Sequence, residues 1–324
     1  MLQRCKYFKA AGAVGMAILL LSAPAEPAEK AKLTIGYSST GPTAVGLWTA
    51  KEIGAFSKYG VEPNFIFISS SPVMVPALIG GDVQCAVAGA NAVIAAALGG
   101  APIVAIASLA NRPYLRLWAQ TEYQRVDELR GKTFGVSRFG ATTDNLTRIL
   151  LRRVGLENAV TIRQLGGTLE VGLAFRQIDA AVLATLRTDV PHRILLELAD
   201  TGIQYSMGQL VVARDFQRRS PETLERILRA YIEGVAALRD PSQKERVTKT
   251  IGYFSRLKEP KAIEEIYADA VKYVDRIPRV EPEAVAASLD FMGKKGQPIE
   301  SFADNSIVDK LMREGFIEQA YKKR

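Results

Sequence analysis

Hydrophobic residues form two kinds of pattern in this chain, short unbroken runs and helical stripes, and the two alternate from Lys32 onward. Runs of strand length lie at residues 33–37, 64–68, 85–88 and 103–108. Helical spacing separates these runs and predicts helices that begin at Pro42 and extend over residues 72–79 and 92–98. Alternating strands and helices predict an α/β fold, with a parallel sheet covered by helices on both faces.

The same alternation restarts in the middle of the chain. Strands are predicted at residues 132–137, 160–165 and 180–183, with helices between them along a stripe from Leu146 to Val154 and over residues 170–175. Residues 77–88 and 173–184 echo one another, because each contains a helix end, a polar turn with an aspartate and a short apolar strand. The echo predicts two lobes of similar design.

Beyond Ala213 the pattern is helical only. Ser220, Pro221 and Glu222 predict a capped helix start, and apolar residues keep a helical period from Leu224 to Leu238. Further stripes lie at residues 263–274, 285–292 and 307–311. Helices without strands of their own must bury these stripes elsewhere, and we expect them on the first lobe.

The first 25 residues predict a secretory signal peptide. Arg4, Lys6 and Lys9 precede an apolar run at residues 10–21, and Ala23 and Ala25 occupy the positions that favour cleavage after Ala25. A membrane anchor is the weaker alternative, because the apolar run is shorter than the roughly 20 residues that a spanning helix needs. We therefore expect an exported protein. No small-residue triplet followed by cysteine ends the apolar run, so we expect no lipid anchor.

The amino-acid composition excludes several classes of functional site. The 324 residues are 48% hydrophobic and 23% charged, as in a folded globular protein. Two cysteines and one histidine exclude a disulfide framework, a Cys/His zinc cluster and any mechanism that needs two histidines. Removal of the three basic leader residues lowers the formal net charge from +8 to +5 and leaves Cys85 as the one cysteine. We expect no cofactor, no metal and no nucleic-acid partner, and we interpret His192 as a surface imidazole.

Ligands of open parallel sheets bind beyond the carboxyl ends of the strands, near helix N-termini. This rule selects four segments, two in each predicted lobe, and the candidate ligand-binding residues are Ser38, Ser39, Thr40, Gly89, Ala90, Asn91, Arg138, Phe139, Gly140, Ala141, Thr142, Thr143, Ala184 and Thr185. Trp48 is added as an apolar wall for an organic solute. Capping and turn formation are the alternative role of each segment taken alone. Together the four segments predict a cleft for an anion, with Arg138 as a possible source of charge.

Several motifs then resemble a known family. They are LTIGY at 33–37, AFSKYGV at 55–61, GGDV at 80–83, ELRGKTFGV at 128–136, GATTD at 140–144 and QIDAAV at 177–182. As a set they resemble the periplasmic substrate-binding proteins of ABC importers, in the NMT1/THI5-like branch for sulfonates, taurine, nitrate and thiamine precursors. The likeness covers about residues 32 to 254. The loop that begins at Ala184 departs from the Ser/Pro-rich sequence common in such proteins, so the solute's identity does not carry over.

The resemblance implies a two-lobed periplasmic-binding-protein fold of type II that closes on its solute by a hinge motion. We expect residues 32–112 and 210–324 to form lobe 1 and residues 113–209 to form lobe 2, with crossings near 111–115 and 206–211. The expected partners are a small organic solute, anionic in character, and a membrane permease, and the expected state is a monomer. A sensor component for a signalling receptor is an alternative function. A periplasmic enzyme is a weaker one, since the cysteine-rich signature of the pyrimidine-synthesising relatives is absent.

Overall fold

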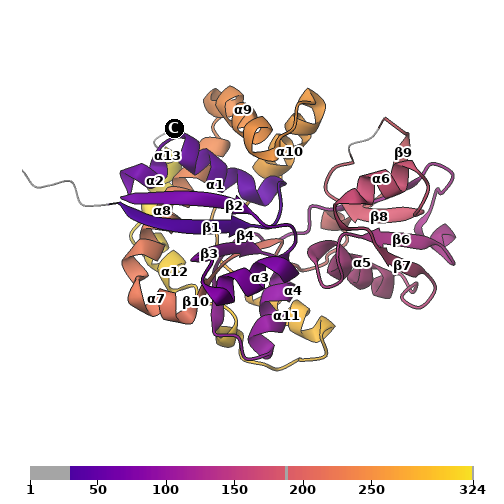
Figure 1. Cartoon of the computed structure of the whole chain (residues 1–324), viewed down its shortest axis with the longest axis horizontal. Helices are drawn as coiled ribbons and strands as arrows, with labels where there is room; N and C mark the ends of the chain where they lie inside the picture. The colour runs from indigo at the N-terminus through magenta and orange to yellow at the C-terminus, as the bar shows by residue number, and fades with distance from the viewer. Residues whose placement is uncertain (1–29, 187–188, 323–324) are drawn as a thin grey trace, which may run out of the picture.

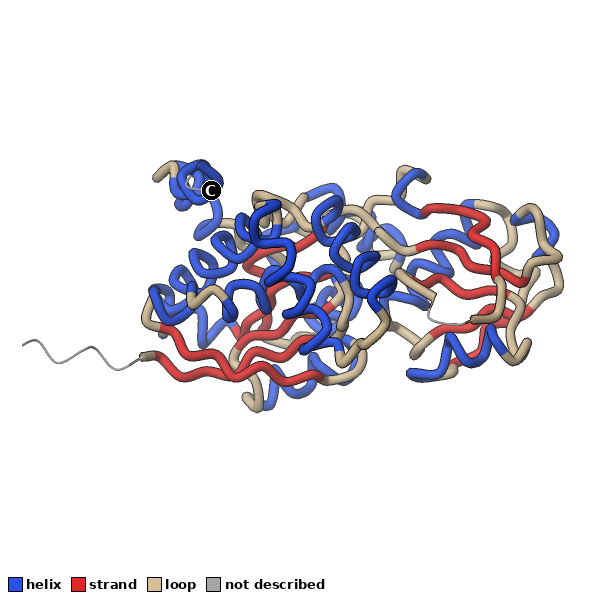
Figure 2. Tube along the Cα trace, turned by 90° about the horizontal axis from the view of Figure 1, so that it is seen from above, coloured by secondary structure: helices blue, strands red, loops and turns tan. Residues whose placement is uncertain are grey.

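Two lobes make up the molecule, each built on a five-stranded sheet (Figure 1). The computed structural model describes residues 30–186 and 189–322, so the predicted signal peptide and Arg187 lie outside the described residues. The first sheet contains β1 (Ala31–Tyr37), β2 (Val61–Phe67), β3 (Cys85–Ala88), β4 (Ile103–Ala110) and β10 (Gly208–Ala213). The second sheet contains β5 (Arg116–Gln120), β6 (Thr133–Val136), β7 (Thr161–Gln164), β8 (Ala180–Leu183) and β9 (His192–Glu197). Figure 2 shows the two sheets side by side, each among its own helices.

The two sheets share one topology, as the sequence echo predicted. Their strand orders are β2-β1-β3-β10-β4 and β7-β6-β8-β5-β9. Strands β1, β2 and β3 run parallel, as do β6, β7 and β8. In each sheet the next strand, β10 or β5, is antiparallel to both of its neighbours and enters from the other lobe. The predicted fold class is confirmed, and each sheet is mixed, with one antiparallel strand that the hydrophobic pattern could not reveal because it does not encode the direction of a strand.

Helices cover both faces of the first sheet, whose side chains alternate between two hydrophobic clusters. Cys85 and Val87 of β3 point into one cluster, and Ala86 and Ala88 point into the other. The first cluster packs α1 (Pro42–Glu52), α2 (Ala55–Lys58), α8 (Pro221–Leu238), α9 (Lys244–Ser255), α10 (Pro260–Tyr273), α12 (Ser306–Arg313) and α13 (Phe316–Lys322). The opposite cluster packs α3 (Ser71–Gly80), α4 (Ala90–Leu98) and α11 (Pro282–Phe291), and the short α7 (Arg214–Arg219) follows β10.

The second lobe has the same layers with fewer helices. Leu146 and Leu150 of α5 (Thr142–Arg153) pack on one face of its sheet, and Leu169 and Leu173 of α6 (Leu169–Ala174) pack on the other. The predicted helix start at Ser220 is correct in position, with Pro221 at the first helical residue, but the Ser220 side chain makes no capping hydrogen bond. Among the residues that the structure describes, no helix is both long enough and apolar enough to cross a bilayer.

The chain crosses between the lobes after β4 and again before β10. At the second crossing the chain has re-entered the first sheet by Gly208, which pairs with Ala110. The two crossings touch: the Met207 amide donates to the Ala110 carbonyl over 2.8 Å, and the Ser108 and Ser206 hydroxyls lie 2.7 Å apart. Asn111 anchors the first crossing, because its backbone and side-chain N–H groups donate to the Asp275 carboxylate over 2.8 and 2.9 Å.

Candidate functional site

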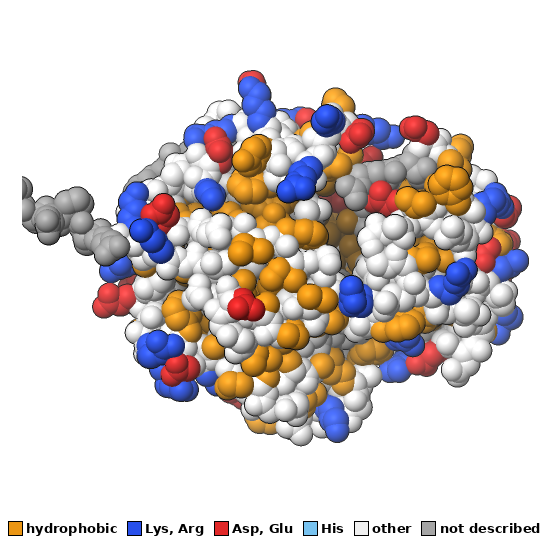
Figure 3. Space-filling model, in the orientation of Figure 1, with side chains coloured by type: hydrophobic (Ala, Val, Ile, Leu, Met, Phe, Trp, Pro, Cys, Tyr) orange, Lys and Arg blue, Asp and Glu red, His pale blue; other side chains and the backbone are white. Residues whose placement is uncertain are grey.

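A cavity of about 330 Å³ lies between the two lobes, where the surface is hollowed in Figure 3. Its walls are the loops that follow β1 and β2 and the end of β3 in the first lobe, and the segments that follow β6, β7 and β8 in the second, together with residues of the crossings and of α10. Small-molecule sites in proteins span roughly 300–1,000 Å³. The volume therefore suits a small solute, and the position allows both lobes to touch it.

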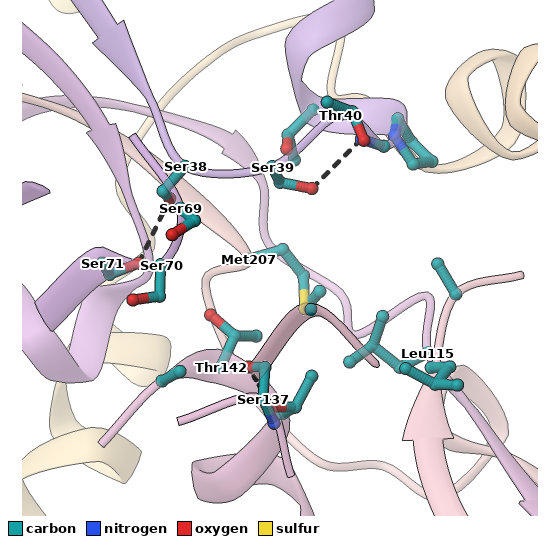
Figure 4. A pocket seen from close by; sticks show the side chains of 18 of the residues that line it. Ser38, Ser39, Thr40, Ser69, Ser70, Ser71, Leu115, Ser137, Thr142 and Met207 are labelled. Carbon is teal, nitrogen blue, oxygen red and sulfur yellow. Dashed lines mark hydrogen bonds between the residues drawn. The ribbon is translucent and has the colours of Figure 1, made fainter. Parts of the chain in front are cut away.

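Serine and threonine hydroxyls line the first-lobe wall (Figure 4); they belong to Ser38, Ser39, Thr40, Thr43, Ser69, Ser70 and Ser71. Two of these residues tie the strand ends together. The Ser38 hydroxyl donates to the Val87 carbonyl over 3.0 Å, and the Gly89 amide donates to the Ser71 hydroxyl over 2.8 Å. Ser38 and Ser71 also lie 3.3 Å apart. These hydrogen bonds hold the ends of β1 and β3 and the start of α3 together as one surface.

Ser70 differs from its neighbours. Its backbone has φ of +76° at the N-cap of α3, a conformation that side-chain-bearing residues adopt rarely. Its hydroxyl oxygen is buried and has no hydrogen-bond partner among the described residues. Strained backbone and unsatisfied buried polar groups both cost free energy and concentrate at functional sites. Ser70 is therefore well placed to bind a solute group.

The start of α1 completes this wall. The Gly41 amide donates to the Ser39 hydroxyl over 3.1 Å, which orders the turn before Pro42. Thr43 lies 3.4 Å, oxygen to oxygen, from the hydroxyl of Tyr114 in the first crossing. Burial raises the pKa of Tyr114 to about 12, so its hydroxyl stays protonated. The α1 N-terminus thus faces the cavity and is held against the crossing.

The second-lobe wall is built at the N-terminus of α5. Thr143 is structural, because its hydroxyl accepts a 3.0 Å hydrogen bond from the Ser137 amide and lies 2.8 Å from the Ser137 hydroxyl. Arg138 is exposed and lines the cavity. It forms no ion pair within the described part of the chain, so its charge is available to an anionic solute at the mouth.

The lobes are in contact where Gly89 meets Thr142. A Cβ atom added at Gly89 would lie 2.3 Å from the Thr142 hydroxyl oxygen, which only the absence of a side chain allows. The buried Tyr205 hydroxyl lies in the same contact, beside Thr142 and Asn145, and burial raises its pKa to about 12. Gly140 of the second lobe similarly faces Pro72 of the first. In this structure the two lobes are therefore in contact beside the cavity.

Thr142 and Thr143 line the cavity, and so do the predicted second-lobe residues Ala141, Ala184 and Thr185. Apolar walls come from Phe67, Leu115, Met207 and Ile266. The cavity therefore presents hydroxyl groups on two sides and hydrocarbon on others, and its charged lining residues in the described part of the chain are Arg138 and Glu170.

Some predicted residues do not line the cavity. Trp48 is 1% exposed and stacks on Phe254 in the first-lobe core, because its face of α1 packs inward. Phe139 points away toward solvent and contacts Arg148. Gly89, Ala90, Asn91 and Gly140 lie behind the cavity wall at the contact between the lobes. His192 is half-buried in β9, where its Nδ1 lies 2.7 Å from the Val190 carbonyl oxygen.

The sequence analysis missed the serines at 69–71, although they follow a predicted strand as Ser38 does. Applied to every strand, the same carboxyl-end rule would have found them. It also missed Tyr114, Leu115, Met207 and Ile266, whose places depend on the crossings and on a late helix rather than on a local motif.

Within residues 30–186 and 189–322 no group of three His, Cys, Asp or Glu side chains could hold a metal ion. The cavity offers instead hydroxyl groups and the N-termini of α1, α3 and α5, whose free N–H groups and dipoles favour negative charge.

Known proteins share this sequence pattern and this fold. The family model described as NMT1/THI5 like matches residues 42–244. A binding protein of Brucella abortus (strain 2308) is 28% identical over 223 residues, which are 66% of this chain and 67% of that protein. The ligand binding component of an ABC-type import system from Staphylococcus aureus has a TM-score of 0.72 at 14% identity, over 87% of this chain and 99% of its own. The alkanesulfonate-binding protein SsuA from Xanthomonas axonopodis pv. citri, bound to MOPS, has a TM-score of 0.68 at 18% identity, over 88% and 98% of the two chains. These structural matches confirm the predicted two-lobed fold.

Proposed function

Because this chain belongs to the NMT1/THI5-like family, we propose that it is the solute-binding component of an ABC importer. It captures a small organic anion, of sulfonate or carboxylate type, between its lobes and delivers it to a membrane permease. The proposal extends to export by the N-terminal leader into the periplasm, to action as a monomer and to the absence of enzymatic activity.

One observation carries the proposal: hydroxyl groups and helix N-termini from both lobes converge on one cavity. The α1 and α3 N-termini come from the first lobe and the α5 N-terminus from the second. Their dipoles stabilise negative charge without a buried cation. The apolar residues Phe67, Met207 and Ile266 suit the hydrocarbon part of such a solute.

Contacts on both lobes also provide the signal for transport. A solute that touches both walls binds the closed form better than the open form and shifts the population toward closure. A shift from 1:99 to 99:1 takes about 5.5 kcal/mol of differential affinity. A solute that contacts one lobe alone would bind the open and closed forms equally. A permease could then not distinguish the loaded protein from the empty one.

A thermal-shift screen tests the proposal. The purified protein is heated with alkanesulfonates, carboxylates, nitrate and neutral nitrogen heterocycles, and a specific solute raises its melting temperature by mass action. At a hundredfold excess over Kd the free energy of unfolding rises by about 2.7 kcal/mol. We expect an anionic member of the panel to give this stabilisation.

The matched variant is Arg138→Gln, which removes a charge at the cavity mouth and leaves the walls unchanged. It is expected to weaken anion binding about tenfold, the effect of losing one charge-assisted hydrogen bond. Calorimetric titration measures the loss. Stabilisation by neutral heterocycles alone, with equal affinity in the variant, would contradict the anionic solute class. An unchanged radius of gyration at saturation would contradict closure.

A further inference from the structure

Arg116 is the first residue of β5 and lies directly after the first crossing between the lobes. Its guanidinium forms two 2.9 Å hydrogen bonds with the two carboxylate oxygens of Asp269 and a third of 2.9 Å with Glu197. It also donates to the carbonyl oxygen of Ala184. The Arg116 side chain is 17% exposed and that of Asp269 is 8% exposed, so this is a largely buried network.

The Arg116–Asp269 pair joins the two lobes. Arg116 belongs to the second sheet, whereas Asp269 is on α10, whose neighbouring residues Ile266, Ala270 and Val274 pack in the first-lobe core. Glu197 lies on β9 beside β5, so the third hydrogen bond stays within the second lobe. One side chain therefore connects α10 of the first lobe to two strands of the second.

Three residues of the cavity wall adjoin Arg116 or its partner Asp269. Leu115 precedes Arg116 in the chain and lines the cavity, as do Ala184, whose carbonyl Arg116 binds, and Ile266, which is nearly one helical turn before Asp269. Arg116 itself is not among the lining residues. It acts on the cavity through these three residues.

We propose that Arg116 is a positioning residue for the solute cavity: by binding Asp269 and the Ala184 carbonyl together, it holds α10 and the Ala184–Thr185 loop as one wall across the two lobes. The role in solute binding rests on the proposed function. Guanidinium suits the task, because its planar group presents several donors in a fixed geometry. A lysine ammonium keeps the charge but cannot make the paired bonds to Asp269 while it holds the carbonyl.

The test measures the distance between the lobes without any solute. Nitroxide labels are attached at Thr121→Cys in the second lobe and Lys294→Cys in the first, both exposed positions, in a Cys5→Ser background. The native Cys85 is buried, and burial raises its pKa to about 12, so it does not compete for the label. Distances are compared for the unsubstituted protein, Arg116→Lys, Asp269→Asn and the control Glu197→Gln.

We expect Arg116→Lys and Asp269→Asn to lengthen and broaden the distance distribution, and Glu197→Gln to leave it unchanged. With ethanesulfonate as the probe, the first two variants are also expected to release it about tenfold faster, because loss of a buried charge-pair partner acts mainly on dissociation. Circular dichroism and melting curves verify that each variant is folded.

An unchanged distance distribution in folded Asp269→Asn and Arg116→Lys would overturn the proposal, and the pair would then be a structural contact only. If the unsubstituted protein binds neither ethanesulfonate nor any other anion of the panel, the proposed function is contradicted. The positioning role of Arg116 is tested separately by the distances. The distance measurement needs no solute, so the two failures are distinguishable.

Discussion

At the scale of single residues, the contact between the lobes depends on the missing side chain of Gly89. Its backbone, with φ of −69° and ψ of 141°, is one that alanine adopts without strain. A methyl group there would nevertheless lie 2.3 Å from the Thr142 hydroxyl oxygen and 3.4 Å from that of Ser71. Gly89 is therefore required by the approach of the lobes and not by its own conformation.

Gly89→Ala is expected to hold the lobes apart and to weaken solute binding about tenfold, since the added methyl group collides with the Thr142 hydroxyl on closure. The melting temperature of the solute-free protein is expected to change little, because the open form has room for the methyl group. Scattering and calorimetric titration measure the two effects. In the double variant with Thr142→Ala, closure seen by scattering is expected to return. Full affinity in the single variant would contradict this account.

Residues that line the cavity were predictable where a local motif marks them. Ser38, Ser39 and Thr40 follow a clear strand and precede a proline-started helix, so the sequence alone identifies them. Trp48 shows the limit of that method. An aromatic residue on a helical stripe can face a solute or the core, and the packing of Phe254, some 200 residues later, decides for the core.

At the scale of elements, α1 carries the first-lobe wall and its position is set by α8. The two helices cross with almost no space between them: a Cβ atom at Gly234 of α8 would lie 2.3 Å from the Gly46 carbonyl oxygen and 2.7 Å from the Ala50 Cβ. These obstacles are backbone or backbone-attached atoms, so a rotamer change does not relieve them.

Gly234→Ala is therefore expected to destabilise the protein by about 1–3 kcal/mol, the usual effect of overpacking. The matched control is Gly80→Ala at the end of α3, where the nearest atom to the added methyl group is 4.0 Å away. That substitution is expected to be neutral or slightly stabilising, since alanine favours helix more than glycine does. Urea denaturation measures both, and equal stability of the two variants would contradict the close crossing.

The hydrophobic periodicity located helices and strands along the chain, but it did not show which strands pair with each other. The strands at 85–88 and 180–183 were predicted with the bounds that the structure shows, because unbroken apolar runs suit sheets buried on both faces. Strands β5, β9 and β10 were missed. They are mixed in composition, and the sheet forms them by pairing across long separations in the chain.

At the scale of the whole molecule, the first crossing is held by a partly buried acid, Asp275. Asp275 accepts two hydrogen bonds from Asn111. Burial nevertheless raises the pKa of Asp275 above its ordinary value of 3.8; the bonds from Asn111 and the charge of Arg112 oppose the rise, and Glu281 adds to it. The neutral acid is thus favoured more in the folded protein than in the unfolded chain.

The sign of the pH effect follows from this shift. The stability that Asp275 contributes is fully present below its unfolded pKa near 3.8 and is lost as the pH rises through its raised folded pKa. The melting temperature of the unsubstituted protein, relative to Asp275→Asn, is therefore expected to fall as the pH rises from 3.5 toward neutrality. Calorimetric scans of both proteins across that window measure the difference, and parallel curves would contradict the shift.

Two separate segments of the chain form the first lobe, and the second lobe lies between them in the sequence. This arrangement sets the order in which the lobes can fold. Strand β4 must wait for β10, and α1 must wait for α8, so the lobe that begins the chain cannot be completed until residues beyond 220 have emerged. The strands of the inserted lobe, in contrast, lie within one continuous segment from β5 to β9. In a chain threaded through a membrane from its N-terminus, the middle of the polypeptide can mature first, and its beginning remains open to chaperones and proteases until the last third arrives.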